Sequence, residues 1–241
     1  MEIKLKTNFS EEVLLLGLDI KFETSLGQQI IINIPKIKDM IGNDSLGRFL
    51  QIMSIDLNKI KEENTSLGFD AETLQGVFIG SKMYGYDQEV IEEGLRFVLP
   101  GTSYTKAGIA VGDQVLLEQD LQLIKNIILV GTGKMSMEDY TTQEKRLGET
   151  EIDRLARERE EKIAKIKKSS PTSKGKEITF AEGMITIISI LPGISLENIR
   201  ELNMFSYKWL LKYAERMVAD RIHVVAAGFG NLKDYKFITD K

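Results

Sequence analysis

Cysteine is absent from this chain of 241 residues, and histidine and tryptophan occur once each. Without cysteine the chain has no disulfides, no thiolate metal ligands and no cysteine nucleophile. A single histidine removes the usual ligands of zinc hydrolases and the usual group for acid–base catalysis near neutral pH. We therefore expect no catalytic residues, no metal and no cofactor, and a protein that is not an enzyme.

A strong basic excess and a long apolar run are also missing. The chain has 32 Lys and Arg against 36 Asp and Glu, a net charge of −4, whereas nucleic-acid-binding domains usually carry a basic face. Its apolar stretches, such as residues 183–194, fall short of the roughly 20 residues that a membrane-spanning helix needs. No signal-peptide pattern follows Met1. We expect no nucleic acid and no membrane as partners, and a soluble protein made inside the cell.

What is present is a globular composition, with 42% hydrophobic and 28% charged residues. Its length suits one or two domains of about 100–200 residues each. Residues 20–34 alternate around the turn-like Ser25-Leu-Gly27 and predict a β-hairpin closed by Pro35. Apolar residues at spacings of three and four then predict several helices. These cover residues 46–60 (capped by Asp44 or Ser45), a short segment at 70–78, residues 87–98, and residues 117–129 (ended by Gly131 and Gly133), with a short β segment at 109–116.

The composition changes near residue 138. Between Glu149 and Lys168 the chain has six acidic and seven basic residues, and neither Gly nor Pro. This pattern is typical of a long solvated helix stabilised by pairs of opposite charge, or of a flexible charged linker. Both interpretations stay open. Residues 169–176, rich in serine and lysine, read as a plain linker.

A second compact unit begins at Thr179, where Thr179-Phe-Ala-Glu182 has the spacing of a capping box. The helix that follows is broken by Pro192-Gly193. Ser195 then starts a short helix, and Asn203 caps a longer one. A unit of about 60 residues has little surface to bury by itself, so we expect it to pack on the first domain or on a partner.

The predicted fold class is α+β and predominantly helical. It has an N-terminal β-hairpin, a helical middle, a long charged helix or arm, and a small C-terminal helical unit. The expected domains are an N-terminal mixed domain at 1–135, the charged arm and linker at 136–177, and the helical domain at 178–241.

Three local patterns suggest chemistry, and each has a simpler interpretation. Gly131-Thr-Gly-Lys134 resembles the end of a phosphate loop, but Ile128 and Met135 stand where that pattern needs a glycine and a hydroxyl. Two glycines in this position are typical of a helix end. His223 lies among apolar residues and fits a half-buried or helix-end histidine. Acidic pairs such as Glu92-Glu93 are typical of exposed helix faces, and nothing selects one pair for catalysis.

The most distinctive local feature is an aromatic cluster in the last predicted helix. Phe205, Tyr207, Trp209 and Tyr213 are too many large residues for one helix face. One face can fill the local core, and another is then free to bind a partner, because exposed Tyr and Trp anchor interfaces well. The alternative is that all of them are core residues. The candidate protein interface consists of Leu202, Phe205, Tyr207, Trp209, Leu210, Tyr213 and Arg216.

Around this cluster the sequence resembles a known family. Residues Ile194–Arg216 are similar to the C-terminal helical segment of tail proteins of large tailed bacteriophages. In those proteins an x-Ile-x-x-Leu-(Asn/Thr) turn leads into an aromatic-x-Tyr-x-(Leu/aromatic) helix with a later Arg. The matching residues are Ile199, Leu202, Asn203, Phe205, Tyr207, Trp209, Leu210 and Arg216. Lys208 stands where a Gln often follows the Tyr, and the upstream order of elements also fits the resemblance.

The resemblance implies a non-enzymatic tail or baseplate protein that acts through protein–protein contacts. Its partners would be other phage tail or baseplate proteins, and a homo-oligomer is a further expectation. Its location would be the host cytoplasm during assembly or the virion tail. Two alternatives stay open: a tail-assembly chaperone absent from the mature virion, and a cellular adaptor in which the charged arm forms a coiled coil.

Overall fold

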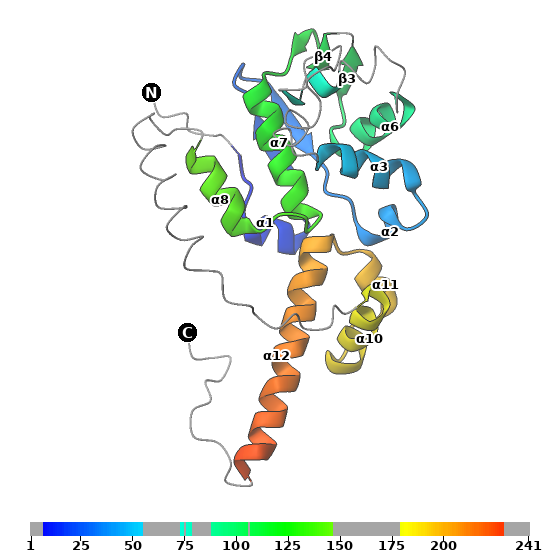
Figure 1. Cartoon of the computed structure of the whole chain (residues 1–241), viewed down its shortest axis with the longest axis vertical. Coiled ribbons are helices and arrows are strands. Elements are labelled where there is room, and N and C mark those ends of the chain that lie inside the picture. The colour runs from blue at the N-terminus through cyan, green and yellow to red at the C-terminus, as the bar shows by residue number, and fades with distance from the viewer. Residues whose placement is uncertain are drawn as a thin grey trace, which may run out of the picture.

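The computed structural model describes residues 7–54, 73–74, 76–78, 88–105, 107–146 and 179–228. These residues form an N-terminal body and a C-terminal helical unit (Figure 1). The body contains α1 (Glu11–Leu16), β1 (Ile20–Glu23), β2 (Gln29–Ile32), α2 (Ile37–Met40), α3 (Asp44–Met53), α6 (Gln88–Val98), β3 (Thr102–Thr105), β4 (Gly108–Val111), β5 (Gln114–Val115), α7 (Glu118–Gly131) and α8 (Met137–Arg146). The helical unit contains α10 (Phe180–Ile190), α11 (Leu196–Arg200) and α12 (Met204–Gly228).

The fold class predicted from the sequence is confirmed. The described residues are mixed α+β and mostly helical, with an N-terminal two-stranded hairpin and C-terminal helices. In the hairpin, β1 pairs antiparallel with β2, so that Phe22 lies opposite Ile30 and Ile20 opposite Ile32. All four side chains are buried on one face, as the two-residue period of a strand requires. The predicted charged segment at 149–168 and the second half of the predicted 46–60 helix lie outside the described residues.

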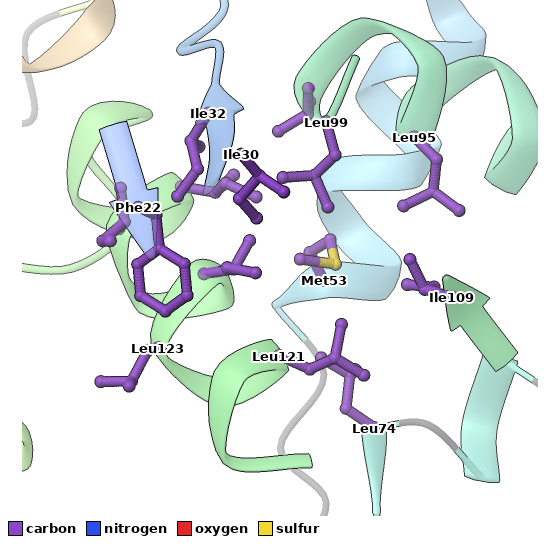
Figure 2. Close-up of a cluster of buried hydrophobic side chains, with 14 of the residues drawn as sticks. Phe22, Ile30, Ile32, Met53, Leu74, Leu95, Leu99, Ile109, Leu121 and Leu123 are labelled. Carbon is purple, nitrogen blue, oxygen red and sulfur yellow. The ribbon is translucent and has the colours of Figure 1, made fainter. Parts of the chain in front are cut away.

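Helix α7 lies at the centre of the body. Most of its residues are buried, including Ile124, Ile127 and Ile128 with no exposed surface. A helix that is apolar on nearly all sides needs neighbours on all sides. Figure 2 shows side chains from the hairpin, α3, α6 and α7 directed into one cluster around Met53. The hairpin turn is fixed to the start of α7, because the buried carboxylate of Asp120 accepts hydrogen bonds from the amide (3.0 Å) and hydroxyl (2.7 Å) of Ser25.

Three details of the body differ from the sequence prediction. Strand β3 was not predicted; it pairs antiparallel with β4 and places Tyr104 opposite Ile109. The N-cap of α3 is Asn43, whose side chain accepts from the amide of Leu46 at 2.9 Å, rather than Asp44 or Ser45. The predicted end of α7 is confirmed, since Gly131 is its last residue and Gly133 follows in the left-handed region, with φ of 68°. Gly131 also lies directly against Ile34, where a Cβ atom would not fit.

The third difference concerns α8, which the sequence assigned to the charged arm. In the structure α8 packs on α7, and Tyr140 is buried in the core of the body. Its ring meets that of Phe9 edge to face, with ring centres 4.8 Å apart. A buried aromatic of this kind stabilises a helix through packing even when the rest of its sequence is polar. The polar composition of residues 138–146 concealed this contact.

The helical unit begins and breaks where its sequence predicts. Thr179 and Glu182 form a capping box at the start of α10, and Ser195 and Asn198 form another at the start of α11. Gly193 lies between them in the left-handed region, with φ of 87°, which suits glycine. The three helices and α2 share a second apolar cluster, formed by Ile37, Ile187, Leu191, Ile199, Tyr207 and Ala214.

Candidate protein-binding surface

The start of α12 is fixed to the body by Asn203. Its side-chain oxygen accepts from the amide of Ser206 at 2.8 Å, which caps the helix as predicted. Its amide nitrogen donates to the carbonyl of Leu14 at 2.8 Å, and the Ser206 hydroxyl donates to the same carbonyl at 3.1 Å. Asn203 and Ser206 are both buried. One residue therefore caps α12 and joins it to the C-terminal end of α1.

The body also contributes to the core of the helical unit. The amide of Ile37 donates to the carbonyl of Leu202 at 2.8 Å, and the Ile37 side chain is buried among α10, α11 and α12. At the other side of α12, the amine of Lys208 donates to the carbonyl of Gly133 at 2.6 Å. The helical unit thus packs on the first domain, one of the two arrangements expected from its small size.

Two exposed ion pairs also join the body to the helical unit. Glu201 accepts from the amine of Lys38 at 2.6 Å and from that of Lys36 at 3.0 Å. These hydrogen bonds, first from Lys38 and then from Lys36, hold the pKa of Glu201 below its ordinary value. All three side chains are partly exposed, so solvent screens the attraction and its contribution to stability is modest.

We expect the substitution Glu201→Gln to reduce the acid sensitivity of the folded state. A carboxylate whose pKa is lowered by folding contributes stability above its unfolded-state pKa, and this contribution is lost as the pH falls through the folded-state pKa. The unfolding free energy of the wild type should therefore decrease more steeply than that of the variant below the ordinary pKa of 4.5. Urea titrations across this range measure both slopes, and equal slopes would contradict the prediction.

A cavity of about 200 Å³ lies at the same junction, between α1, β2, α2 and residues 201–203. Its two asparagines already have partners, since Asn33 donates to the carbonyl of Phe97 and Asn203 to that of Leu14. In the part of the chain that the structure describes, there is also no group of three or more His, Cys, Asp or Glu able to hold a metal ion. The cavity lining also includes Lys36 and Glu201, which pair with each other, and Asp39, which accepts from the amide of Lys36.

The structure divides the seven predicted interface residues into two sets. Tyr207 is buried, its hydroxyl donates to the carbonyl of Phe180 at 3.1 Å, and burial raises its pKa. Phe205 packs on the core of the body, while Leu202 and Leu210 pack on the core of the helical unit. These four side chains hold α12 in place, and we assign them to internal packing.

The other three residues lie at the surface. Trp209 is 43% exposed and Tyr213 is 38% exposed. Their rings stack one turn apart, with centres 5.7 Å apart and planes 5° from parallel. Arg216, about one turn further along, is also exposed. Helical periodicity places all three on the side of α12 opposite Tyr207. We call Trp209, Tyr213 and Arg216 the aromatic face.

Comparisons with protein-family models, with curated proteins and with solved structures find no match to this chain. No helix within the described ranges is both long and apolar enough to cross a membrane. The case for a function therefore depends on the geometry of the chain itself and on the resemblance of residues 194–216.

The other patterns noted in the sequence form no chemical site in the described residues. The Gly131–Lys134 segment connects α7 to α8 and follows a helix where a phosphate loop follows a strand, so it is not a phosphate loop. The Lys134 amine donates to the carbonyl of Leu50 at 3.0 Å, and its burial lowers its pKa. Glu118 accepts from the amide of Leu74 at 2.8 Å. His223 lies in α12, but the structure does not describe its side chain.

Sequence reasoning missed one surface in the helical unit. The outer side of α10 exposes Ile185 and Ile188, although this helix also packs on α12 with its inner side. A signal was present, because residues 183–196 contain no charged side chain. A helix exposed on one side normally has charged residues there.

Proposed function

We propose that this chain is a non-enzymatic subunit of a larger protein assembly, and that it binds a partner protein through the aromatic face. The assembly we propose is the tail or baseplate of a tailed bacteriophage. The observation that carries the proposal is the exposed, stacked pair of Trp209 and Tyr213 on a helix fixed to the body.

The chemistry of the aromatic face suits protein binding. Trp, Tyr and Arg are the residues most often found at the energetic centres of protein interfaces, because they bury much area and also form polar contacts. Trp209 and Tyr213 restrict each other's rotation by stacking, so less side-chain entropy is lost on binding. The anchoring of α12 at Asn203 holds both rings in a fixed position relative to the body.

The choice of a phage tail or baseplate is supported by the resemblance over Ile194–Arg216. That segment covers α11 and the first half of α12, including the whole aromatic face. The residues shared with the family include those that cap and pack α12 as well as Trp209 and Arg216. If the family positions this helix as the present chain does, both the packing residues and the exposed residues would be shared.

Replacing Trp209 with Ala should weaken incorporation of the chain into its assembly by at least about tenfold, as expected for a residue at an interface centre. Particles purified from the source, with wild-type or variant chain, would be compared by peptide mass spectrometry. Because Trp209 is partly exposed, the melting temperature should change little. The matched control is Leu26→Ala, in the hairpin turn, where an exposed apolar residue is removed away from α12. A folded W209A chain that is incorporated normally would contradict the proposal.

Copy number in the same particles separates the two phage roles. A small multiple of three or six copies per particle would support a structural subunit. Absence from particles, together with co-purification alongside unassembled tail proteins, would support an assembly chaperone. Absence from both would overturn the phage assignment.

A further inference from the structure

Helix α10 exposes apolar residues on the side that faces away from α12. Ile185 is 65% exposed and Ile188 is 39% exposed, and α11 adjoins α10 and adds Leu196 at 50%. We call these three residues the outer patch. No charged residue occurs between Glu182 and Glu197, so nothing in this stretch favours solvent strongly. A helix that is apolar on both sides is normally covered on both sides.

A second uncovered surface lies on α12. The face of α12 that packs on α10 contains Tyr207, Leu211 and Ala214, and it continues with Val218 and Ile222 at the same spacings of three and four residues. Val218 is 36% exposed and Ile222 is 61% exposed. Figure 1 shows why, since α12 extends well beyond α10 and away from the body. We call Val218 and Ile222 the distal patch.

The distal half of α12 has a physical reason to be covered. Isolated helices shorter than about 12–15 residues are marginal in water, and most helical stability in proteins comes from packing an apolar face. The face in question is already the packing face of the proximal half. An apolar helix surface laid against the distal patch would extend the α10–α12 interface along the rest of α12.

The two patches together provide the apolar centre of an interface. At roughly 150–200 Å² of surface for a large apolar residue, the outer patch offers about 200–300 Å² of exposed apolar area and the distal patch about 150–200 Å². One patch alone is no larger than the apolar patches of ordinary monomers. Both patches together supply about half of the roughly 800 Å² per partner of a standard interface, and a polar rim supplies the rest.

Charge also permits two copies to meet here. The outer patch lies in an uncharged stretch, and the distal patch is flanked on α12 by Glu215 and Arg221, one acid and one base. Bringing two copies together therefore adds no net repulsion. In a two-fold dimer, if surface A of the first copy contacts surface B of the second, then surface B of the first copy contacts surface A of the second. Two different patches on one unit meet this requirement.

We propose that a second copy of this chain covers these surfaces, with the outer patch of each copy lying on the distal patch of the other. The resulting two-fold dimer leaves both aromatic faces free. It goes beyond the proposed function and does not depend on it, because Trp209 and Tyr213 are in neither patch.

Sedimentation velocity over a range of concentrations tests the dimer. The wild type should sediment as a dimer of a 27.2 kDa chain, whereas Ile185→Glu and Ile222→Glu should each raise the dissociation constant at least about 30-fold, because every dimer uses both patches. Both residues are largely exposed, so circular dichroism should show unchanged folding. The matched control is Leu26→Glu, which places the same charge on an exposed leucine of the hairpin turn and should leave the dimer intact.

Introduced thiols test the pairing itself, because the chain has no cysteine of its own. Ile185→Cys and Ile222→Cys place a thiol at the most exposed residue of each patch. A mixture of the two variants should form the mixed disulfide on oxidation, and neither variant alone should form much of its own. A wild type that stays monomeric at all concentrations would overturn the proposal. Efficient cross-linking of I185C alone would also overturn it, because the outer patches of two copies would then meet each other. A monomer that cosediments with lipid vesicles would overturn it as well, because the patches would then bind a membrane. Normal incorporation of W209A would instead count against the proposed function and leave the dimer unaffected.

Discussion

Gly94→Ala is expected to destabilise the body by about 2 kcal/mol or more, although alanine is the better helix former by about 1 kcal/mol. Gly94 is buried in α6 where this helix crosses α3, and a Cβ atom there would overlap the ring of Phe49. That ring has no exposed surface and belongs to the main core. Its neighbours are close-packed, so accommodating one extra carbon requires the two helices to separate.

The matched control for this prediction is Gly47→Ala. Gly47 also lies inside a helix, α3, but it is exposed and nothing lies within 4 Å of the position of an added Cβ. There the substitution should stabilise the protein by about 0.5–1 kcal/mol through helix propensity alone. Urea unfolding of both variants gives the two free energies. If Gly94→Ala were as stable as Gly47→Ala, the close approach of α3 and α6 would be wrong.

Asn203→Ala should cost about 2 kcal/mol and weaken the attachment of the helical unit to the body. The substitution removes an N-cap, worth about 1 kcal/mol, and the buried hydrogen bond to the carbonyl of Leu14, worth about another. The Ser206 hydroxyl still donates to that carbonyl, so the carbonyl is not left without a partner. The Ser206 amide donates to the Asn203 side chain. Its hydrogen-exchange rate should therefore increase by a larger factor than the rates of amides inside α7.

Two companion variants separate the roles of Asn203. Asn203→Asp keeps an oxygen to cap α12 but replaces the amide donor with a carboxylate facing the Leu14 carbonyl, so it should lose the link to α1 and retain the cap. Ser195→Ala removes the equivalent N-cap side chain of α11, whose hydroxyl oxygen accepts from the amide of Asn198 within the same capping box. It should reduce stability by about 1 kcal/mol without faster exchange at Ser206. Equal effects of all three variants would contradict this division.

Local signals in the sequence predicted much of the helical unit. Thr179, Ser195 and Asn203 begin helices because their side-chain oxygens can accept from amides three residues ahead, a contact that depends on sequence neighbours alone. The alternation of residues 20–32 predicted the hairpin for the same reason. These elements are local, and each is specified within a few residues.

The features that were missed depend on distant partners. Strand β3 has the polar sequence Thr-Ser-Tyr-Thr and becomes a strand because β4 pairs with it. The end of α7 at Gly131 was predicted, but the close approach of Ile34, which leaves no room for a Cβ atom there, was not. At the candidate site, the sequence identified the aromatic cluster. It could not separate Tyr207 from Trp209, because that distinction is made by α10, which packs on one side of α12 only.

The junction between the body and the helical unit also has a consequence for the order of folding. Its hydrogen bonds join residues far apart in the chain: Asn203 to Leu14, 189 positions apart, and Lys36 to Glu201, 165 positions apart. During synthesis the body leaves the ribosome well before α12 does, so the carbonyl of Leu14 and the side chain of Ile37 stay in water during that interval. Contacts of such sequence separation form late, because closing a long loop costs entropy before any contact repays it. We therefore expect α12 to dock after the body has folded, so that the aromatic face reaches its fixed position late in folding.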